Sequence, residues 1–147
     1  MLLLLVHLAA TLFMTGVIWF VQIVHYPLFG KVGTAGYTEY AAAHSRQTTW
    51  VVAPPMLIEL ITAGLLAVHP PEPIALWQAR FGLVLVGIVW ISTLFLQVPQ
   101  HNVLGHGYDP RAHTRLVQSN WVRTVCWTVR SLLVLWMVAS CFPRGNT

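Results

Sequence analysis

The fourth apolar stretch of the chain, NWVRTVCWTVRSLLVLWMVAS, carries two arginines in a segment that otherwise suits lipid. Its polar and aromatic residues Asn120, Arg123, Trp127 and Arg130 follow one another at steps of three or four, so they share one face of a helix. Two other stretches repeat the pattern, with Thr15, Trp19, Gln22 and His25, and with Trp90, Thr93 or Leu94, Gln97 and His101. In lipid such stripes must face a bundle interior or a polar cavity. The pattern therefore predicts a polar, aromatic-lined pocket inside a helix bundle.

Histidines from three separate segments would meet at one end of this pocket. His25 ends the first apolar stretch, His101 follows the third, and His44 precedes the second, one helical turn after Tyr40. Histidines and a carboxylate can bind a transition metal such as iron, copper or zinc, and helix bundles commonly build metal sites from inward-facing residues. The predicted ligands are His25, His44, His101 and Glu59. No Glu-x-x-His or His-x-x-x-His signature accompanies them, so a site without a metal is the alternative.

Without a metal, the same residues support acid–base chemistry. A histidine can accept a proton at neutral pH, and guanidinium groups can stabilise the negative oxygen that forms. In this interpretation the catalytic residues are His25, His44, His101, Arg123, Arg130 and Glu59. The residues predicted to contact the substrate are Gln22, Tyr40, Gln97, Asn120 and Trp127. All of these side chains also have a purely structural interpretation, as hydrogen-bonding or packing residues between helices.

Glu59 and Arg130 are expected to lie at the same depth in the membrane. Glu59 lies nine residues after Trp50 and Arg130 ten after Asn120, so both lie about 14–15 Å from the same membrane surface at roughly 1.5 Å per residue. Glu59 is the only acidic residue in the apolar stretches. Because an isolated charge in lipid is costly, we expect Glu59 to pair with Arg130. The pair could be purely structural, or it could orient Arg130 toward a substrate.

Four transmembrane helices are the elements that must carry these residues. Hydrophobic residues make up 56% of the 147-residue chain and charged residues only 8%, whereas a soluble domain has about 25% charged residues. Stretches long enough to span a bilayer, roughly 20 apolar residues, occur at about 3–25, 49–69, 79–100 and 119–142. We therefore expect an all-α fold, a single integral membrane four-helix bundle over residues 1–147. Pro54 and Pro55 predict a kink in the second helix.

Charge placement predicts the orientation and the partners of the bundle. The loops after the first and third stretches hold Lys31, Arg46, Arg111 and Arg115, whereas the side with the termini holds Arg80 and Arg144. By the positive-inside tendency the two long loops face the cytoplasm and both termini lie outside, and we expect a bacterial inner membrane. The net charge of +4 includes no basic run, which excludes a nucleic-acid surface. The expected partners are the lipid bilayer, a lipophilic small molecule, and a homo-oligomer or larger membrane complex.

The segments VPQHNVL and RLVQSNWVRTVCWTVRSLLVL resemble the anthrone-oxygenase-like family, small four-helix membrane proteins of which many are known only as a domain of unknown function. That family has a proline and an Asn or His at the end of its third helix, and it opens the fourth with Asn, a hydrophobic pair and Arg-Thr. The matching residues are Pro99, His101, Asn102, Leu104, Asn120, Arg123 and Thr124. GVIWFVQIVHYPLF resembles the first helix of the family, which ends before a proline. The similarity covers nearly the whole chain and is most specific in its C-terminal half.

The resemblance implies a membrane-embedded protein, some of whose relatives oxygenate anthrones to anthraquinones during polyketide tailoring without a conventional cofactor. Together with the residue pattern it predicts an oxidoreductase or oxygenase that acts on a lipophilic aromatic or quinoid substrate. One alternative is an accessory subunit of a larger membrane complex that holds a metal, haem, quinone or pigment. Another is a purely structural bundle in which the polar stripes only join the helices.

Overall fold

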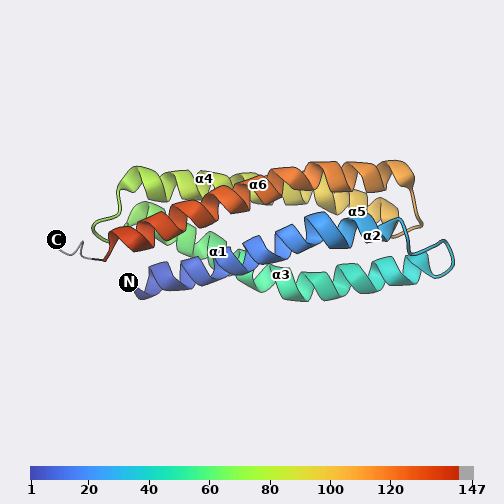
Figure 1. The fold of residues 1–147 in the computed structure, drawn as a ribbon, viewed down its shortest axis with the longest axis horizontal. Coiled ribbons are helices and arrows are strands. Elements are labelled where there is room, and N and C mark those ends of the chain that lie inside the picture. Colours follow the sequence, from blue (N-terminus) through green and yellow to red (C-terminus); the bar gives the residue numbers. More distant parts are fainter. Residues whose placement is uncertain (143–147) are drawn as a thin grey trace.

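The computed structural model describes residues 1–142 and is a bundle of four long helical segments. Its long helices are α1 (Leu2–Phe20), α3 (Tyr37–Val68), α4 (Leu76–Ser92) and α6 (Pro110–Ser140). They run side by side, and the N-terminus and the end of α6 lie at the same end of the bundle (Figure 1). The all-α four-helix fold predicted from the sequence is confirmed.

All four segments are long and apolar enough to cross a membrane. With the short helices that extend them, they cover Leu2–Phe29, Tyr37–Val68, Leu76–Gly105 and Pro110–Ser140. The second segment begins about a dozen residues before its predicted span, and the fourth begins about nine residues before. In both cases the polar segment before the span, which precedes Trp50 or Asn120, contains no residue that interrupts a helix. Asp109 caps the fourth, and its carboxylate accepts hydrogen bonds from the backbone N–H groups of Arg111 (2.7 Å) and Ala112 (2.8 Å).

Two prolines are accommodated by π-helical turns and do not end the spans. After α1 the chain makes a π-helical turn, Val21–His25, and continues as α2 (Tyr26–Phe29), which contains Pro27. After α4 a second π-helical turn, Thr93–Gln97, leads into α5 (Val98–Leu104), which contains Pro99. Proline cannot donate to the carbonyl four residues earlier, and in both cases that carbonyl lies within the π-helical turn. In contrast, α3 continues as an α-helix through Pro54 and Pro55.

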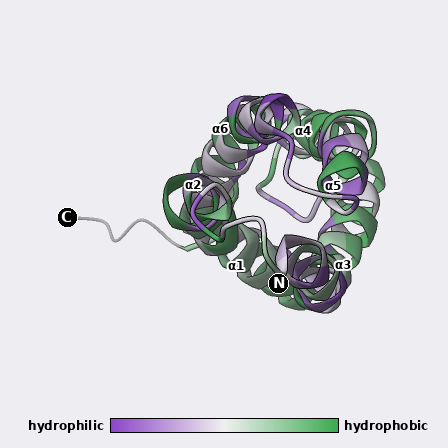
Figure 2. Cartoon of the chain, turned by 90° about the vertical axis from the view of Figure 1, so that its right-hand side faces the viewer, coloured by the Kyte–Doolittle hydropathy of each residue, from purple (hydrophilic) through white to green (hydrophobic). Residues whose placement is uncertain are grey.

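The helices form a closed ring with an apolar outer face. Helix α1 contacts α3 and α6, and α4 contacts the same two helices, as the view onto the end opposite the termini shows (Figure 2). Large apolar side chains point outward on every helix, among them Phe13, Ile61, Phe95 and Leu132. An outer face of this kind is consistent with contact with a lipid bilayer.

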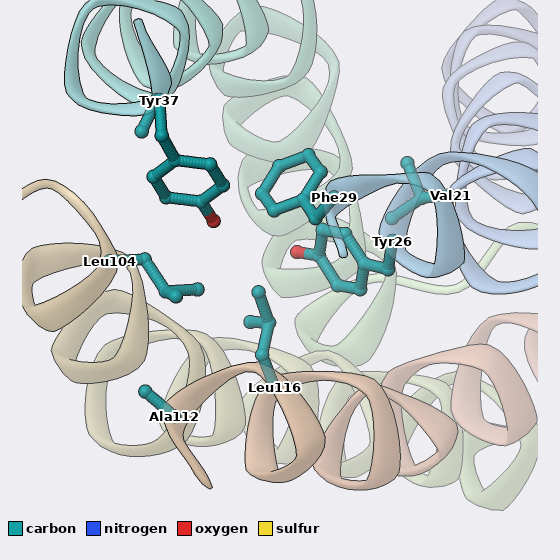
Figure 3. Close-up of a cluster of buried hydrophobic side chains, with 8 residues drawn as sticks. Val21, Tyr26, Phe29, Tyr37, Leu104, Ala112 and Leu116 are labelled. Atoms are coloured by element: carbon teal, nitrogen blue, oxygen red, sulfur yellow. The ribbon is translucent and has the colours of Figure 1, made fainter. Parts of the chain in front are cut away.

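A compact apolar cluster closes the bundle at the end opposite the termini. It contains Val21, Tyr26, Phe29, Tyr37, Ala41, Leu104, Ala112 and Leu116. Figure 3 shows the hydroxyl groups of Tyr26 and Tyr37 directed into the middle of this cluster. The Tyr37 hydroxyl is the only buried side-chain polar atom in residues 1–142 that has no hydrogen-bond partner. The cluster fixes the ends of the first three helical segments against α6.

A polar network ties the four helices together near the middle of the bundle. Arg130 on α6 donates to Glu59 Oε1 on α3 through Nε (3.1 Å) and Nη2 (2.9 Å), and to the carbonyl oxygen of Gly82 on α4 through Nη1. Thr11 on α1 donates to the same carboxylate oxygen (2.8 Å), and Trp127 Nε1 donates to the other (2.9 Å). Both charged side chains are buried. The predicted pairing of Glu59 with Arg130 is confirmed.

His7 on α1 extends this network toward the termini, and the sequence patterns did not predict it. Its Nε2 lies 3.3 Å from Arg130 Nη2, and its Nδ1 lies 2.6 Å from Thr62 Oγ1. A guanidinium group can only donate, so Nε2 is the acceptor and Nδ1 carries the proton. His7 is therefore a neutral hydrogen-bond bridge between α1, α3 and α6.

We expect Glu59→Gln to lower the free energy of unfolding by about 3–5 kcal/mol, because Arg130 would become a buried cation without a counter-ion. In an Arg130→Met background the same substitution should cost much less. A double-mutant cycle, with chemical unfolding followed in detergent, measures the difference. Additive losses would show that the two side chains do not depend on each other.

Candidate functional site

A cavity of about 270 Å³ lies between the middle of the bundle and the end opposite the termini. Its apolar wall is formed by Met14, Val17, Ile18, Val21, Val52, Met56 and Val98. The polar and aromatic residues of its lining include Tyr26, His44, Thr48, Thr93, Gln97, His101, Arg123 and Trp127. A mainly apolar cavity with a few polar groups is typical of small-molecule sites, whose volumes are roughly 300–1,000 Å³. We call it the Arg123 cavity.

Arg123 is held in this cavity by neutral partners only. Its Nε and Nη2 donate to Asn120 Oδ1 at 2.9 and 2.6 Å. Nη1 donates to Thr93 Oγ1 at 3.3 Å, and Nη2 donates to the Tyr26 hydroxyl at 3.4 Å. The guanidinium carbon lies 5.9 Å from the centre of the Trp127 ring, and only 9% of the residue is exposed. These contacts fix the position of the cation but do not neutralise it.

All four acidic side chains of the protein lie within the described residues, and none of them is a partner of Arg123. Glu59 forms the one ion pair found in residues 1–142, with Arg130. Asp109 caps α6, Glu39 lies in the first turn of α3, and Glu72 lies in the connection between α3 and α4. A buried charge without a counter-charge is costly. The cavity is therefore electrostatically suited to an anionic group.

Tyr26 connects this cation to an imidazole. Its hydroxyl lies 3.0 Å from His101 Nε2 and accepts the hydrogen bond from Arg123. Since the hydroxyl oxygen accepts from Arg123, its own hydrogen is free to be donated to His101. In this arrangement the hydroxyl can pass its proton to His101 while it accepts another from a bound molecule. Arg123, Tyr26 and His101 thus form a cation with an adjoining proton relay.

Gln22 and Asn120, predicted to contact a substrate, instead hold Arg123 in place. Neither residue lines the cavity. Asn120 is fully buried, and its Nδ2 donates to Gln22 Oε1 at 2.8 Å while its oxygen accepts from Arg123. Gln22 Nε2 donates to the carbonyl oxygen of Val117. Helix spacing shows which face a residue occupies but not whether a neighbouring side chain covers it.

Gln97 and Trp127 do line the cavity, as predicted. Gln97 is anchored on both sides of its amide, because its oxygen accepts from Ser92 at 3.1 Å and its nitrogen donates to Ser119 at 3.1 Å. Trp127 is completely buried, and its N–H is directed to Glu59. Its ring is thus a fixed wall between the Arg123 cavity and the central polar network.

The three predicted histidines lie close together. His25 Nε2 is 2.9 Å from His44 Nδ1, and the ring centres of His44 and His101 are 5.6 Å apart. His44 and His101 line the Arg123 cavity, whereas His25 lies outside it. Tyr40, predicted to contact a substrate, also lies outside the cavity and packs on Phe29 and His44 at 5.6 and 6.4 Å between ring centres. One ring nitrogen of each of the three histidines thus lies within hydrogen-bonding distance of a protein partner, which for His101 is the Tyr26 hydroxyl.

The predicted metal ligands His25, His44, His101 and Glu59 are not assembled into one site. Glu59 lies fifteen residues beyond His44 on the same helix, a distance of about 22 Å at 1.5 Å per residue. Both carboxylate oxygens of Glu59 are already hydrogen-bonded. Within residues 1–142 no three His, Cys, Asp or Glu side chains are arranged to hold a metal ion. Glu59 and Arg130, predicted as catalytic, do not line the cavity and approach it only through Trp127.

Tyr26 is a residue that the sequence places near the pocket but to which the sequence patterns assigned no role in the site. It lies four positions after Gln22, so the polar stripe of the first helix continues to Tyr26 as well as to His25. The π-helical turn before it adds a residue to the helix turn and changes which side chains face inward. The spacing of the stripe is thus compatible with Tyr26, but the neighbouring His25 was chosen because histidine is the more common acid–base residue.

Comparisons of this chain with protein-family models, with curated proteins and with solved structures give no match. The resemblance to anthrone-oxygenase-like proteins therefore stays a prediction that rests on the residues quoted above.

The two buried arginines should differ strongly in their effect on stability. Arg130→Met leaves Glu59 as an unpaired buried carboxylate and should cost about 3–5 kcal/mol of unfolding free energy. Arg123→Met removes a cation that has no acidic partner and leaves only neutral acceptors, so it should cost roughly 1–2 kcal/mol. Chemical unfolding of both variants in the same detergent makes the comparison. Equal losses would contradict the conclusion that Arg123 lacks a counter-charge.

Proposed function

We propose that this protein is a membrane-embedded oxygenase-like enzyme that binds a lipophilic aromatic or quinoid molecule with an acidic proton in the Arg123 cavity. The single observation that supports it is a buried guanidinium group in an apolar cavity with neutral partners only. An anionic oxygen of a bound molecule would supply the missing counter-charge. Ionisable residues inside a membrane bundle commonly mark functional sites.

In the proposed reaction the substrate loses a proton to the Tyr26–His101 pair. The hydroxyl of Tyr26 takes the substrate proton as its own proton moves to His101 Nε2, across the 3.0 Å hydrogen bond. Arg123 then stabilises the negative charge, which is delocalised onto the oxygen of a phenolate or enolate. Trp127, Met14 and Met56 exclude water and offer apolar surface to an aromatic ring.

Dioxygen, which dissolves in the bilayer, is the proposed oxidant. The substrate carbanion forms a carbon–oxygen bond with dioxygen, and the resulting peroxide takes back the proton held by His101. Loss of water from this hydroperoxide leaves a carbonyl group at the carbon that was deprotonated. In sum, one CH₂ group and one dioxygen molecule give one carbonyl group and one water molecule, so no further reductant is required.

The decisive variant for this proposal is Arg123→Met. With an anthrone as substrate and the protein in lipid nanodiscs, we expect kcat/KM for dioxygen consumption and quinone formation to fall by about 100-fold or more, because the developing oxyanion loses its main stabilising group. Quinone absorbance and an oxygen electrode measure the rate above that of empty nanodiscs. Arg80→Met is the matched control, since Arg80 is exposed on α4 and should leave the rate unchanged.

Asn120→Asp tests the charge argument from the opposite direction. It retains the oxygen that accepts from Arg123, loses the hydrogen bond to Gln22 and gives Arg123 a carboxylate partner, so the substrate anion loses its counter-charge and turnover should fall as well. Turnover that persists in both Arg123→Met and Asn120→Asp would contradict the proposal. Binding of the anthrone without dioxygen consumption would contradict catalysis and would favour a subunit that only holds its ligand.

A further inference from the structure

A second cavity, of about 510 Å³, opens on the outer face of the bundle between the first helical segment and α3. It shares five lining residues with the Arg123 cavity, namely Val17, Val21, His44, Thr48 and Val52. The second cavity, which we call the α1–α3 groove, therefore adjoins the Arg123 cavity on the side of the lipid-facing surface.

The α1–α3 groove has the surface that a hydrocarbon chain requires. Its walls include Phe20 and Val51, of which 58% and 51% are exposed. Gly16 is an exposed residue of its lining, and a Cβ atom added at this position would have no atom within 4 Å. The hydrogen-bonded pair of His25 and His44 lies at its polar end. The groove thus has a polar end at the two histidines and exposed apolar walls on the outer face of the bundle.

We propose that the α1–α3 groove holds the hydrocarbon chain of a ligand whose ring lies in the Arg123 cavity. The ligand class is then an aromatic compound with an ionisable oxygen, such as a phenol or the enol of an anthrone-like ketone, that carries a long alkyl or isoprenoid chain. Three observations lead to this class: a buried cation that needs an anionic oxygen, a cavity of about 270 Å³ that suits a ring but not a ring with a long chain, and a groove that adjoins this cavity and opens on the outer face with exposed apolar walls. This inference rests on the proposed function, because it takes the Arg123 cavity as the site of the ring.

The test compares two phenols that differ only in chain length. The binding of para-methylphenol and para-dodecylphenol is measured by calorimetry with the full-length protein in phosphatidylcholine nanodiscs, and empty nanodiscs give the correction for partitioning. Gly16→Phe fills the groove without touching the Arg123 cavity. We expect it to raise the Kd of para-dodecylphenol by about tenfold or more, since several methylene groups lose their apolar surface, and to change that of para-methylphenol by less than about twofold.

Gly87→Phe is the matched control. Gly87 lies on α4, lines neither cavity, and also has open space where a side chain would be added. It should leave both dissociation constants unchanged. An equal effect of Gly16→Phe on the two phenols, or no effect on either, would overturn the inference and would mean that the groove only accommodates a bilayer lipid. If Arg123→Met leaves the binding of para-methylphenol unchanged, the proposed function itself fails, and the inference fails with it.

Discussion

Hydrocarbon supplies no hydrogen-bond partners, so the polar groups that α6 carries into the bilayer must find their partners within the bundle. This constraint explains the arrangement of the bundle. Arg130 obtains its partners from α1, α3 and α4 through His7, Glu59 and the carbonyl of Gly82. Because these groups must converge on one guanidinium, they fix the relative depth and rotation of the helices. The apolar outer face contributes little to this specificity, since lipid chains are as apolar as the side chains that meet them.

The same constraint gives the two buried arginines different roles. Arg130 is neutralised by Glu59 and belongs to the framework, whereas Arg123 keeps its positive charge beside an apolar cavity. The amides of Asn120 and Gln22 hold Arg123 in position without neutralising it. A framework needs only the first kind of arginine. The second kind has no counter-charge within the bundle, and binding of an anion is the role that we propose for it.

The sequence predicted the number of helices, their polar stripes and the Glu59–Arg130 pair, because charges are so rare in the spans that few pairings were available. It did not predict the π-helical turns, which alter the positions of Tyr26 and Gln97 relative to a regular helix. It also placed Glu59 among the ligands of a histidine site, although the depth of Glu59 near the middle of the membrane already separates it from histidines at one surface. Helix spacing assigns each residue to a face and a depth. Whether its side chain lines a cavity or instead holds a neighbouring side chain depends on packing.

The most direct test of the account is to locate a bound phenolic molecule. We would determine the crystal structure of the protein with a brominated naphthol and find the bromine by its anomalous scattering. The account predicts one ordered molecule in the Arg123 cavity, with its oxygen within hydrogen-bonding distance of the Arg123 guanidinium group and its ring beside Trp127. A molecule bound elsewhere, or one whose oxygen points away from Arg123, would contradict the central claim that this cation is the anion site of the protein.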